Sequence, residues 1–249
     1  MDSATLIPIA AAAFLVGGTI KGLVGIGLPT AAIAFMTLFL DPRLAIALVL
    51  FPMLGSNLWQ MVRGGYLIRT VKRYALFAGI LFAGVSATAY GTQSASDRVM
   101  LAVLGVAVLI FVAASWRKII PPLQEKYDKT AQVVFALISG VIGGMTAAWG
   151  PPMAMYLATK QVDKDEFVRA TGFMISVGSI PLVVAYAQIG FMPAPIAGLS
   201  ALMLIPTLIG FAVGEYFRSK LSGDGFRNAI LILFLFLGLN LIRRAIWYS

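Results

Sequence analysis

Eight apolar runs fill nearly all of this 249-residue sequence, and they constrain its fold more than any other feature. The runs lie at residues 6–40, 44–62, 74–96, 99–116, 131–159, 170–192, 194–217 and 226–248. About 20 helical residues cross the apolar core of a bilayer, so each run is long enough for a transmembrane helix. Only 12% of the residues are charged. We therefore predict an all-α membrane protein with a single domain over residues 1–249.

The absence of two residue types excludes much of enzyme chemistry. The sequence contains neither Cys nor His, which removes disulfides, Cys/His metal sites, His-based triads and thiol nucleophiles. It has no Walker A motif, and its acidic residues lie mainly between the apolar runs or at their ends. We expect no enzyme activity, no cofactor and no metal site.

Two of the runs, 6–40 and 131–159, are too long for one crossing. Both contain Gly and Pro near their middles, in GLVGIGLPTAAI (22–33) and GGMTAAWGPPMAMYL (143–157). Gly weakens a helix, and Pro removes a donor and clashes with the preceding turn. We predict helix breaks at Gly25, Pro29, Pro151 and Pro152. For the first run, a hairpin and a single broken span both remain open.

The distribution of Lys and Arg favours a hairpin for the second long run. If all eight runs cross once, ten basic residues lie on one face and eight on the other, which gives no orientation. If run 131–159 enters and leaves on the same face, fourteen basic residues gather on one face. The other face then holds four, namely Arg43, Arg98, Arg243 and Arg244. We therefore predict this hairpin, with the more basic face cytoplasmic and the C-terminus outside.

A weak internal repeat relates the two halves. A shift of 122 residues matches nine identical residues within positions 15–51, including Gly18 with Gly140 and Pro29 with Pro151. Repeat one covers about residues 1–120 and repeat two about 125–249, each a broken segment followed by three ordinary runs. A hairpin gives each half an odd number of crossings, so the halves are predicted to be inverted. Both termini are then extracytoplasmic.

The broken runs are the natural place for a binding site. Unpaired backbone groups inside a membrane must face protein or a watery cavity, and restarted helices direct N–H groups at an anion. We expect the two breaks to meet near the bilayer centre. Lys21 is the only clearly intramembrane cation, and such a residue normally has a partner or a ligand. The alternative is that Lys21 snorkels to an interface or pairs with a carbonyl at the break.

Neutral polar residues complete the predicted site. Buried amides such as Asn57 and Gln60 are costly without partners, whereas Ser and Thr often bond their own helix. The predicted substrate-binding residues are Lys21, Gly22, Gly27, Thr30, Asn57, Gln60, Thr146, Trp149, Gly150, Ser176 and Ser179. The alternative is that the glycines serve helix packing and the prolines serve folding alone. Glu215, three residues before Arg218, predicts a surface ion pair rather than a proton site.

At these residues the sequence resembles the sulfite exporter TauE/SafE family of bacterial membrane permeases. GLVGIGLPT resembles the glycine-rich first segment of that family, and GPPMAMYL followed by DKDEFVRATGFMISVGSIP resembles its second-half signature. The resemblance extends over essentially the whole chain, although Leu28 stands where the family often has Gly. It implies transport of a small anion, typically sulfite, thiosulfate or an organosulfonate such as sulfoacetate, and usually export across the inner membrane.

A secondary transporter with alternating access at the membrane midplane is the leading hypothesis. The alternatives are an anion channel, a permease for small carboxylates, and uptake instead of export. The expected partners are a small anionic substrate and the lipid bilayer. A coupling H⁺ or Na⁺ and a homodimer stay open. No nucleic-acid partner is expected, because the net charge of +9 comes from basic residues in the connections between the runs.

Overall fold

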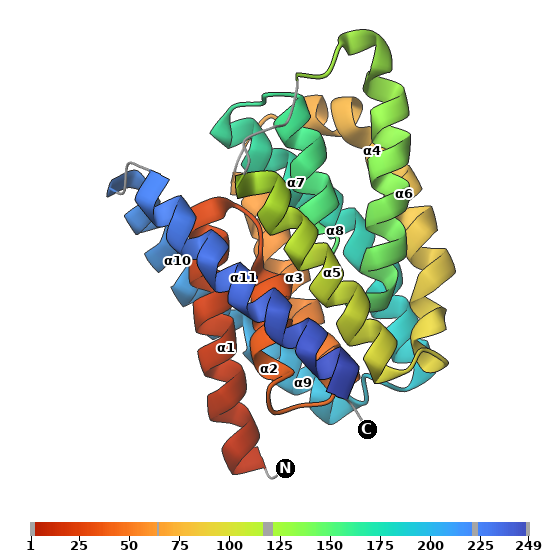
Figure 1. Cartoon of the computed structure of the whole chain (residues 1–249), viewed down its shortest axis with the longest axis vertical. Coiled ribbons are helices and arrows are strands. Elements are labelled where there is room, and N and C mark those ends of the chain that lie inside the picture. The colour runs from red at the N-terminus through yellow and green to blue at the C-terminus, as the bar shows by residue number, and fades with distance from the viewer. Residues whose placement is uncertain (1–2, 64, 117–121, 221–223, 248–249) are drawn as a thin grey trace.

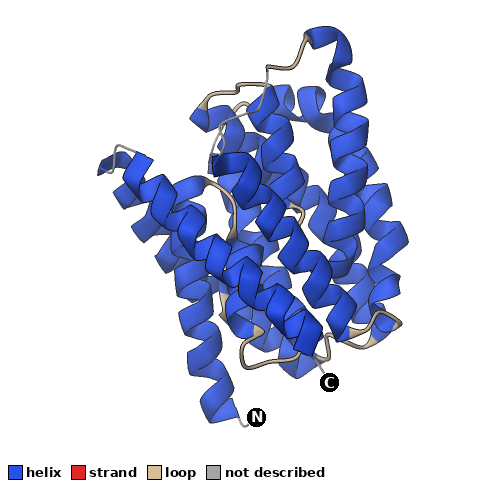
Figure 2. Ribbon diagram, in the orientation of Figure 1, coloured by secondary structure: helices blue, strands red, loops and turns tan. Residues whose placement is uncertain are grey.

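The structure is a computed structural model that describes residues 3–63, 65–116, 122–220 and 224–247. Within these residues it contains helices and connections but no strand (Figure 2), which confirms the predicted all-α class. Six helical stretches are long and apolar enough to cross a membrane. They are Thr5–Val24, Pro42–Arg63, Leu67–Gln93, Glu125–Thr146, Lys164–Ile189 and Ala194–Arg218.

The helices follow the predicted runs with shifted boundaries. The first half contains α1 (Ser3–Val24), α2 (Leu28–Met36), α3 (Pro42–Arg63), α4 (Leu67–Thr88), the 3-10 helix η1 (Ala89–Gln93) and α5 (Asp97–Trp116). The second half contains the 3-10 helix η2 (Glu125–Tyr127), α6 (Asp128–Thr146), α7 (Gly150–Thr159), α8 (Lys164–Ile189), α9 (Ala194–Leu202), α10 (Leu204–Lys220) and α11 (Asp224–Trp247). Helices α4 and α8 begin before the apolar runs at 74 and 170, because charged residues occupy their first turns.

The predicted run 194–217 is two helices instead of one. Helix α9 ends at Leu202, Met203 forms a turn, and α10 begins at Leu204. Pro206 has no N–H to donate to the carbonyl of Leu202, and its ring clashes with that turn. The helix is therefore interrupted at this point.

Helices α1 and α2 form a hairpin. Gly25 and Gly27, which connect them, have φ angles of 90° and 104°, a conformation that glycine adopts without strain. Gly17 of α1 lies against Leu28 and Ala32 of α2, whereas a continuous helix would separate residues 17 and 32 by about 22 Å. Helix α2 therefore runs back beside α1 (Figure 1).

Helices α6 and α7 repeat this arrangement. Ala147 follows α6 with a left-handed φ of 57°, and a Cβ on Gly143 of α6 would lie 2.2 Å from the ring of Trp149. Helix α7 packs back against α6. The helix boundaries recur at the shift found in the sequence, since α1 and α6 end, and α2 and α7 begin, 122 residues apart.

The helices that lead into the two breaks, α1 and α6, run toward opposite ends of the bundle. The first break packs at Gly25 against Phe167 and Val168, in the first turns of α8. The end of α6, which precedes the second break, lies at the far end of α4, because a Cβ on Gly144 would meet Thr88 and Ala89. Helices α4 and α8 begin at the same end, where Arg73 pairs with Glu166. The expectation that the breaks meet near the bilayer centre stays a prediction.

Close glycine contacts bring α1 and α10 together. A Cβ on Gly18 would lie 2.3 Å from the carbonyl oxygen of Thr207, and one on Gly22 would lie 2.2 Å from that of Phe211. These glycines let α1 and α10 pack backbone to backbone, and α1 is continuous to Val24. In the other half Gly84 and Gly140 bring α4 and α6 together in the same way.

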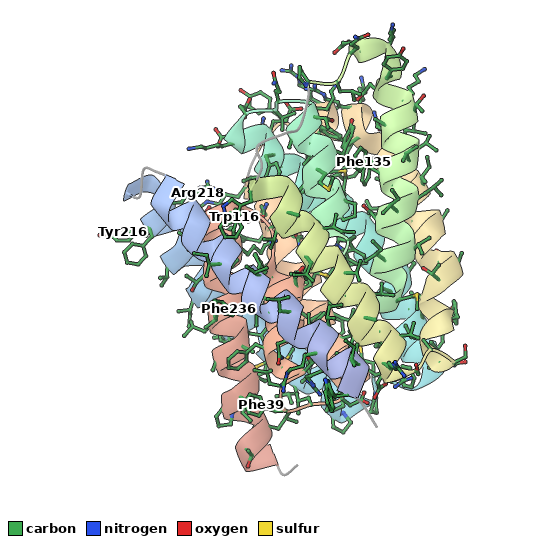
Figure 3. All side chains as sticks on the ribbon, viewed as in Figure 1. Phe39, Trp116, Phe135, Tyr216, Arg218 and Phe236 are labelled. Atoms are coloured by element: carbon green, nitrogen blue, oxygen red, sulfur yellow. The ribbon has the colours of Figure 1, made fainter. Side chains whose placement is uncertain are left out.

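The helix pairs repeat between the halves. Helix α1 packs on α10 as α6 packs on α4, and α2 packs on α11 as α7 packs on α5, while α3 packs on α8 and α5 on α11. The start of α1 and the end of α11 lie at the same end of the bundle (Figure 1). Large apolar side chains cover the outside, among them Phe39, Tyr216 and Phe236 (Figure 3), each more than half exposed. This surface suits contact with lipid.

Candidate functional site

Lys21 lies inside the protein, near the end of α1. It is 1% exposed, and its Nζ donates a hydrogen bond of 2.5 Å to Oδ1 of Asn57 on α3. The amide of Asn57 is held in place, because its Nδ2 donates to the carbonyl of Met53 at 2.7 Å. Lys21 therefore does not snorkel, and its described partner is a side-chain amide rather than a backbone carbonyl.

The charge of Lys21 is not neutralised by a carboxylate. In the described part of the chain no ion pair includes Lys21. An ammonium group has three N–H donors, and a single amide oxygen accepts only one of them here. A buried charge without a counter-ion is costly, so the site favours an anion.

Gln60 connects the first helix break to α8. Its Nε2 donates to the carbonyl oxygens of Gly25 at 3.2 Å and Val168 at 2.7 Å, and it lies 3.3 Å from Oγ1 of Thr171. Its Oε1 is buried and has no hydrogen-bond partner among the described residues. We name Lys21, Gly25, Asn57 and Gln60 together the Lys21 cluster.

The start of α2 borders the Lys21 cluster. Gly27 precedes α2 and lies against Ile20, the neighbour of Lys21. Pro29 occupies the first turn, where its missing N–H costs nothing. Thr30, in the same turn, is buried at 5% exposure. The first turn of a helix leaves N–H groups without intrahelical partners and carries a positive partial charge, so α2 adds to the attraction for an anion.

The Lys21 cluster lies off the middle of α3, toward one end of the bundle. Asn57 precedes the last residue of α3, Arg63, by six residues and follows the first, Pro42, by fifteen. At a rise of 1.5 Å per residue these separations are about 9 Å and about 22 Å. The cluster therefore lies on the side where α4 and α8 begin.

The second break has its own polar residues. Trp149 is fully buried, and its Nε1 has no partner among the residues described. Thr146 donates to the carbonyl of Ile142 at 2.7 Å, so its hydroxyl is committed to its own helix. Gly150 begins α7, followed by Pro151 and Pro152 in the first turn. Among the described residues, no hydrogen bond joins these residues to the Lys21 cluster.

Three further predicted residues have simpler explanations. Ser176 and Ser179 donate to the carbonyls of Gly172 at 2.7 Å and Ile175 at 2.6 Å, one turn earlier in α8. Gly22 packs against the backbone of α10. The alternatives considered for them, own-helix hydrogen bonding and helix packing, account for these contacts. Sequence reasoning missed Ser139, whose buried hydroxyl is unpartnered among the described residues, because position 139 aligns with Gly17 in the repeat.

The family model described as sulfite exporter TauE/SafE matches residues 9–241. The chain belongs to the sulfite exporter TauE/SafE family. Comparisons with curated proteins and with solved structures gave no significant match. The match confirms the resemblance seen in the sequence, and it identifies the helical bundle as that of a membrane permease. Lys21 and both helix breaks lie within the matched residues.

This TauE/SafE protein also holds two carboxylate networks where α4, α6 and α8 begin. Glu166 accepts hydrogen bonds from Arg73 at 2.6 Å and from the hydroxyl of Tyr74 at 2.7 Å. Asp128 accepts one from Tyr156 at 2.9 Å and pairs with Lys160 at 3.2 Å. Sequence reasoning missed them, because the partners are 28 to 93 residues apart.

At the opposite end of this TauE/SafE bundle, Arg43 pairs with Asp41 and Asp97 and donates to the carbonyl of Thr92 at 3.2 Å. Burial raises the pKa of Asp41, and a hydrogen bond with Asp97 acts in the same direction. Glu215 pairs with Arg63 at 3.0 Å. The predicted surface ion pair is present, but its described partner is Arg63 of α3 instead of Arg218.

Proposed function

We propose that this protein is a secondary transporter that exports a small anion, and that the anion binds at the Lys21 cluster. Sulfite, thiosulfate and organosulfonates such as sulfoacetate are the proposed substrates, in keeping with the TauE/SafE family. The observation that carries the proposal is the burial of Lys21 beside a helix break, with a neutral amide as its described partner.

The chemistry of the cluster suits one small oxyanion. The ammonium of Lys21 supplies the charge, and Asn57 and Gln60 place neutral amides beside it. The first turn of α2 adds N–H groups and, at Thr30, a hydroxyl. A mobile anion supplies the negative charge that the protein does not supply there, and it can leave again, as transport requires.

Alternating access is proposed from the internal symmetry. The helix boundaries of the two hairpins recur after 122 residues, and helix pairs in one half have counterparts in the other. Such a pattern supports two inverted repeats, repeat one over about 1–120 and repeat two over about 125–249. The two hairpins would exchange roles as each half rocks against the other, which opens the cluster first to one side and then to the other.

The orientation follows from charge. The end at which α4 and α8 begin contains Arg69, Lys72, Arg73, Lys164 and Arg169, among the fourteen basic residues of the more basic face. By the positive-inside rule this end is proposed to be cytoplasmic, in the bacterial inner membrane, with both termini outside. The Lys21 cluster would then lie closer to the cytoplasm, where an exporter loads its substrate.

Ligand-dependent thermal stability of the purified protein tests the substrate class. A ligand that binds the folded state raises its stability by mass action. We expect a saturable rise in unfolding temperature with sulfite, thiosulfate or sulfoacetate, and a smaller rise with acetate or malonate. Stabilisation by the carboxylates alone would support a carboxylate permease and contradict the proposed sulfur specificity.

A further inference from the structure

A small cavity lies between the first turns of α4 and α8, at the end of the bundle nearer the Lys21 cluster. Its volume is about 100 Å³, and Arg69, Arg73 and Arg169 are part of its lining. A water molecule occupies about 30 Å³ of liquid. The cavity therefore has room for one oxyanion of a few heavy atoms.

The carboxylates of this cavity are engaged elsewhere. Glu166 accepts hydrogen bonds from Arg73 and from Tyr74, at 2.6 and 2.7 Å. Asp163 caps α8, because its Oδ1 accepts from the backbone N–H of Glu166 at 2.7 Å. Glu166 therefore balances the charge of Arg73, and Asp163 satisfies a backbone N–H at the start of α8. Two further guanidinium groups remain in the cavity wall.

Those two groups belong to Arg69 and Arg169. Neither has a carboxylate partner within the described ranges. The guanidinium of Arg169 lies over the ring of Tyr66, 5.4 Å from its centroid, which holds it at the cavity wall. Guanidinium groups present paired N–H donors that match the oxygens of an oxyanion. The cavity thus combines positive charge, donors and a suitable size.

The cavity adjoins the Lys21 cluster through α8. Arg169 follows Val168, whose carbonyl accepts a hydrogen bond from Gln60 and whose side chain contacts Gly25. On the outer side a wider depression of about 1180 Å³ shares Arg69 and Arg73 with the cavity and adds Lys72. Basic residues therefore follow a line from the surface of the protein toward Lys21.

We propose that this arginine cavity is a second anion site, at which a small oxyanion from the cytoplasm is captured before it moves to Lys21. The proposal rests on the proposed function for the identity of the anion. Positive charge in a recess concentrates anions and speeds their capture in a way that salt weakens. The cavity therefore acts on loading, and Lys21 acts on the transported anion.

Calorimetric titration of the purified full-length chain with sodium sulfite at low ionic strength tests this proposal. We expect two classes of binding site in the wild type. The double variant Arg69→Gln/Arg169→Gln should lose the class that weakens as salt is added, and it should keep the class that Lys21→Met removes. The control Lys129→Gln/Lys164→Gln removes the same charge from exposed residues near the starts of α6 and α8, and it should keep both classes. Equal binding by the arginine variant and the control would overturn the proposal.

Two further experiments distinguish this proposal from the proposed function, and a free anion from a lipid phosphate. Sulfite binding that depends on the arginines but not on Lys21 would leave the cavity site standing and remove the proposed central site. The titration is repeated in nanodiscs of phosphatidylcholine with and without phosphatidylglycerol. Equal arginine-dependent binding in both supports a free anion. Loss of that binding when phosphatidylglycerol is present assigns the cavity to a lipid phosphate and overturns the capture of substrate.

Transport gives a kinetic readout of the same site. In vesicles with the cytoplasmic face exposed, the arginine variant should raise the sulfite concentration for half-maximal flux by about 3- to 10-fold at low salt, with the maximal rate unchanged. High salt should remove the difference from the wild type. An equal half-saturation concentration at low salt would contradict a role in capture.

Discussion

Nζ of Lys21 on α1 donates its hydrogen bond to Oδ1 of Asn57 on α3, and both side chains are almost completely buried. The pair joins an amine to a neutral amide, so no carboxylate cancels a positive charge on Lys21. A carboxylate in place of Asn57 would cancel that charge permanently. The neutral partner keeps the cation available to a mobile anion.

Lys21→Met should weaken anion binding at the Lys21 cluster and leave the fold intact. Methionine fills a similar volume without a charge, and replacing a buried charge by an apolar group is often neutral or stabilising. Losing a charge-assisted contact of about 3 kcal/mol weakens binding by about a hundredfold. Thermal shift with sulfite measures both quantities. A variant that is stabilised by sulfite as strongly as the wild type would show that Lys21 is not part of the site.

Asn57→Asp should block the same site by a different route. The new carboxylate would form a permanent ion pair with Lys21 and would repel an incoming anion. Sulfite transport in proteoliposomes should fall to background. Asn57→Leu should also impair transport, and it should unfold at a lower temperature, because it leaves the ammonium without its described partner. Wild-type flux in Asn57→Asp would argue against an anion beside Lys21.

Gly22→Ala should weaken the packing of α1 on α10. The added Cβ would lie 2.2 Å from the carbonyl oxygen of Phe211, so the two helices must move apart, at a cost of about 1–3 kcal/mol. Gly79→Ala is the matched control, since no atom lies within 4 Å of its added Cβ, and alanine there should raise helix stability by about 0.5–1 kcal/mol. Thermal unfolding compares the two. A destabilised Gly79→Ala with an unchanged Gly22→Ala would refute this account of the α1–α10 contact.

Cysteine labelling tests the proposed orientation, because the chain has no native Cys. Single cysteines at Ser3 and Ser249 should react with an impermeant reagent on intact cells, and one at Lys129 should react only after permeabilisation. Ser249 lies outside the described residues, so the result at Ser3 connects the experiment to α1. The reverse pattern would place the basic face outside and contradict loading from the cytoplasm.

Much of the architecture follows from local sequence signals. Gly25, Gly27 and the prolines at 29, 151 and 152 mark chain reversals, because their backbone requirements are local. Lys21 is detectable for a similar reason, as a charge inside an apolar run. The repeat of 122 residues also appears in both the sequence and the helix boundaries.

The packing role of the glycines before the first break could not be predicted in the same way. Gly18 and Gly22 precede the first break and look like helix breakers, but they pack against α10, which is about 190 residues away in the chain. The sequence alone does not distinguish a glycine that ends a helix from a glycine that lets two helices pack closely. The ion pair of Arg73 with Glu166 could not be predicted from the sequence either, since only the tertiary fold brings these residues together.

Counterflow of labelled sulfite into proteoliposomes most directly tests the claim that Lys21 holds a transported anion. Unlabelled sulfite inside the vesicles should accelerate the uptake of labelled sulfite by the wild type, because a carrier that returns loaded moves faster than an empty one. The rate should saturate with sulfite concentration, and folded Lys21→Met protein should show no counterflow. Counterflow by Lys21→Met at the wild-type rate, or a wild-type flux that neither saturates nor responds to internal sulfite, would contradict the account.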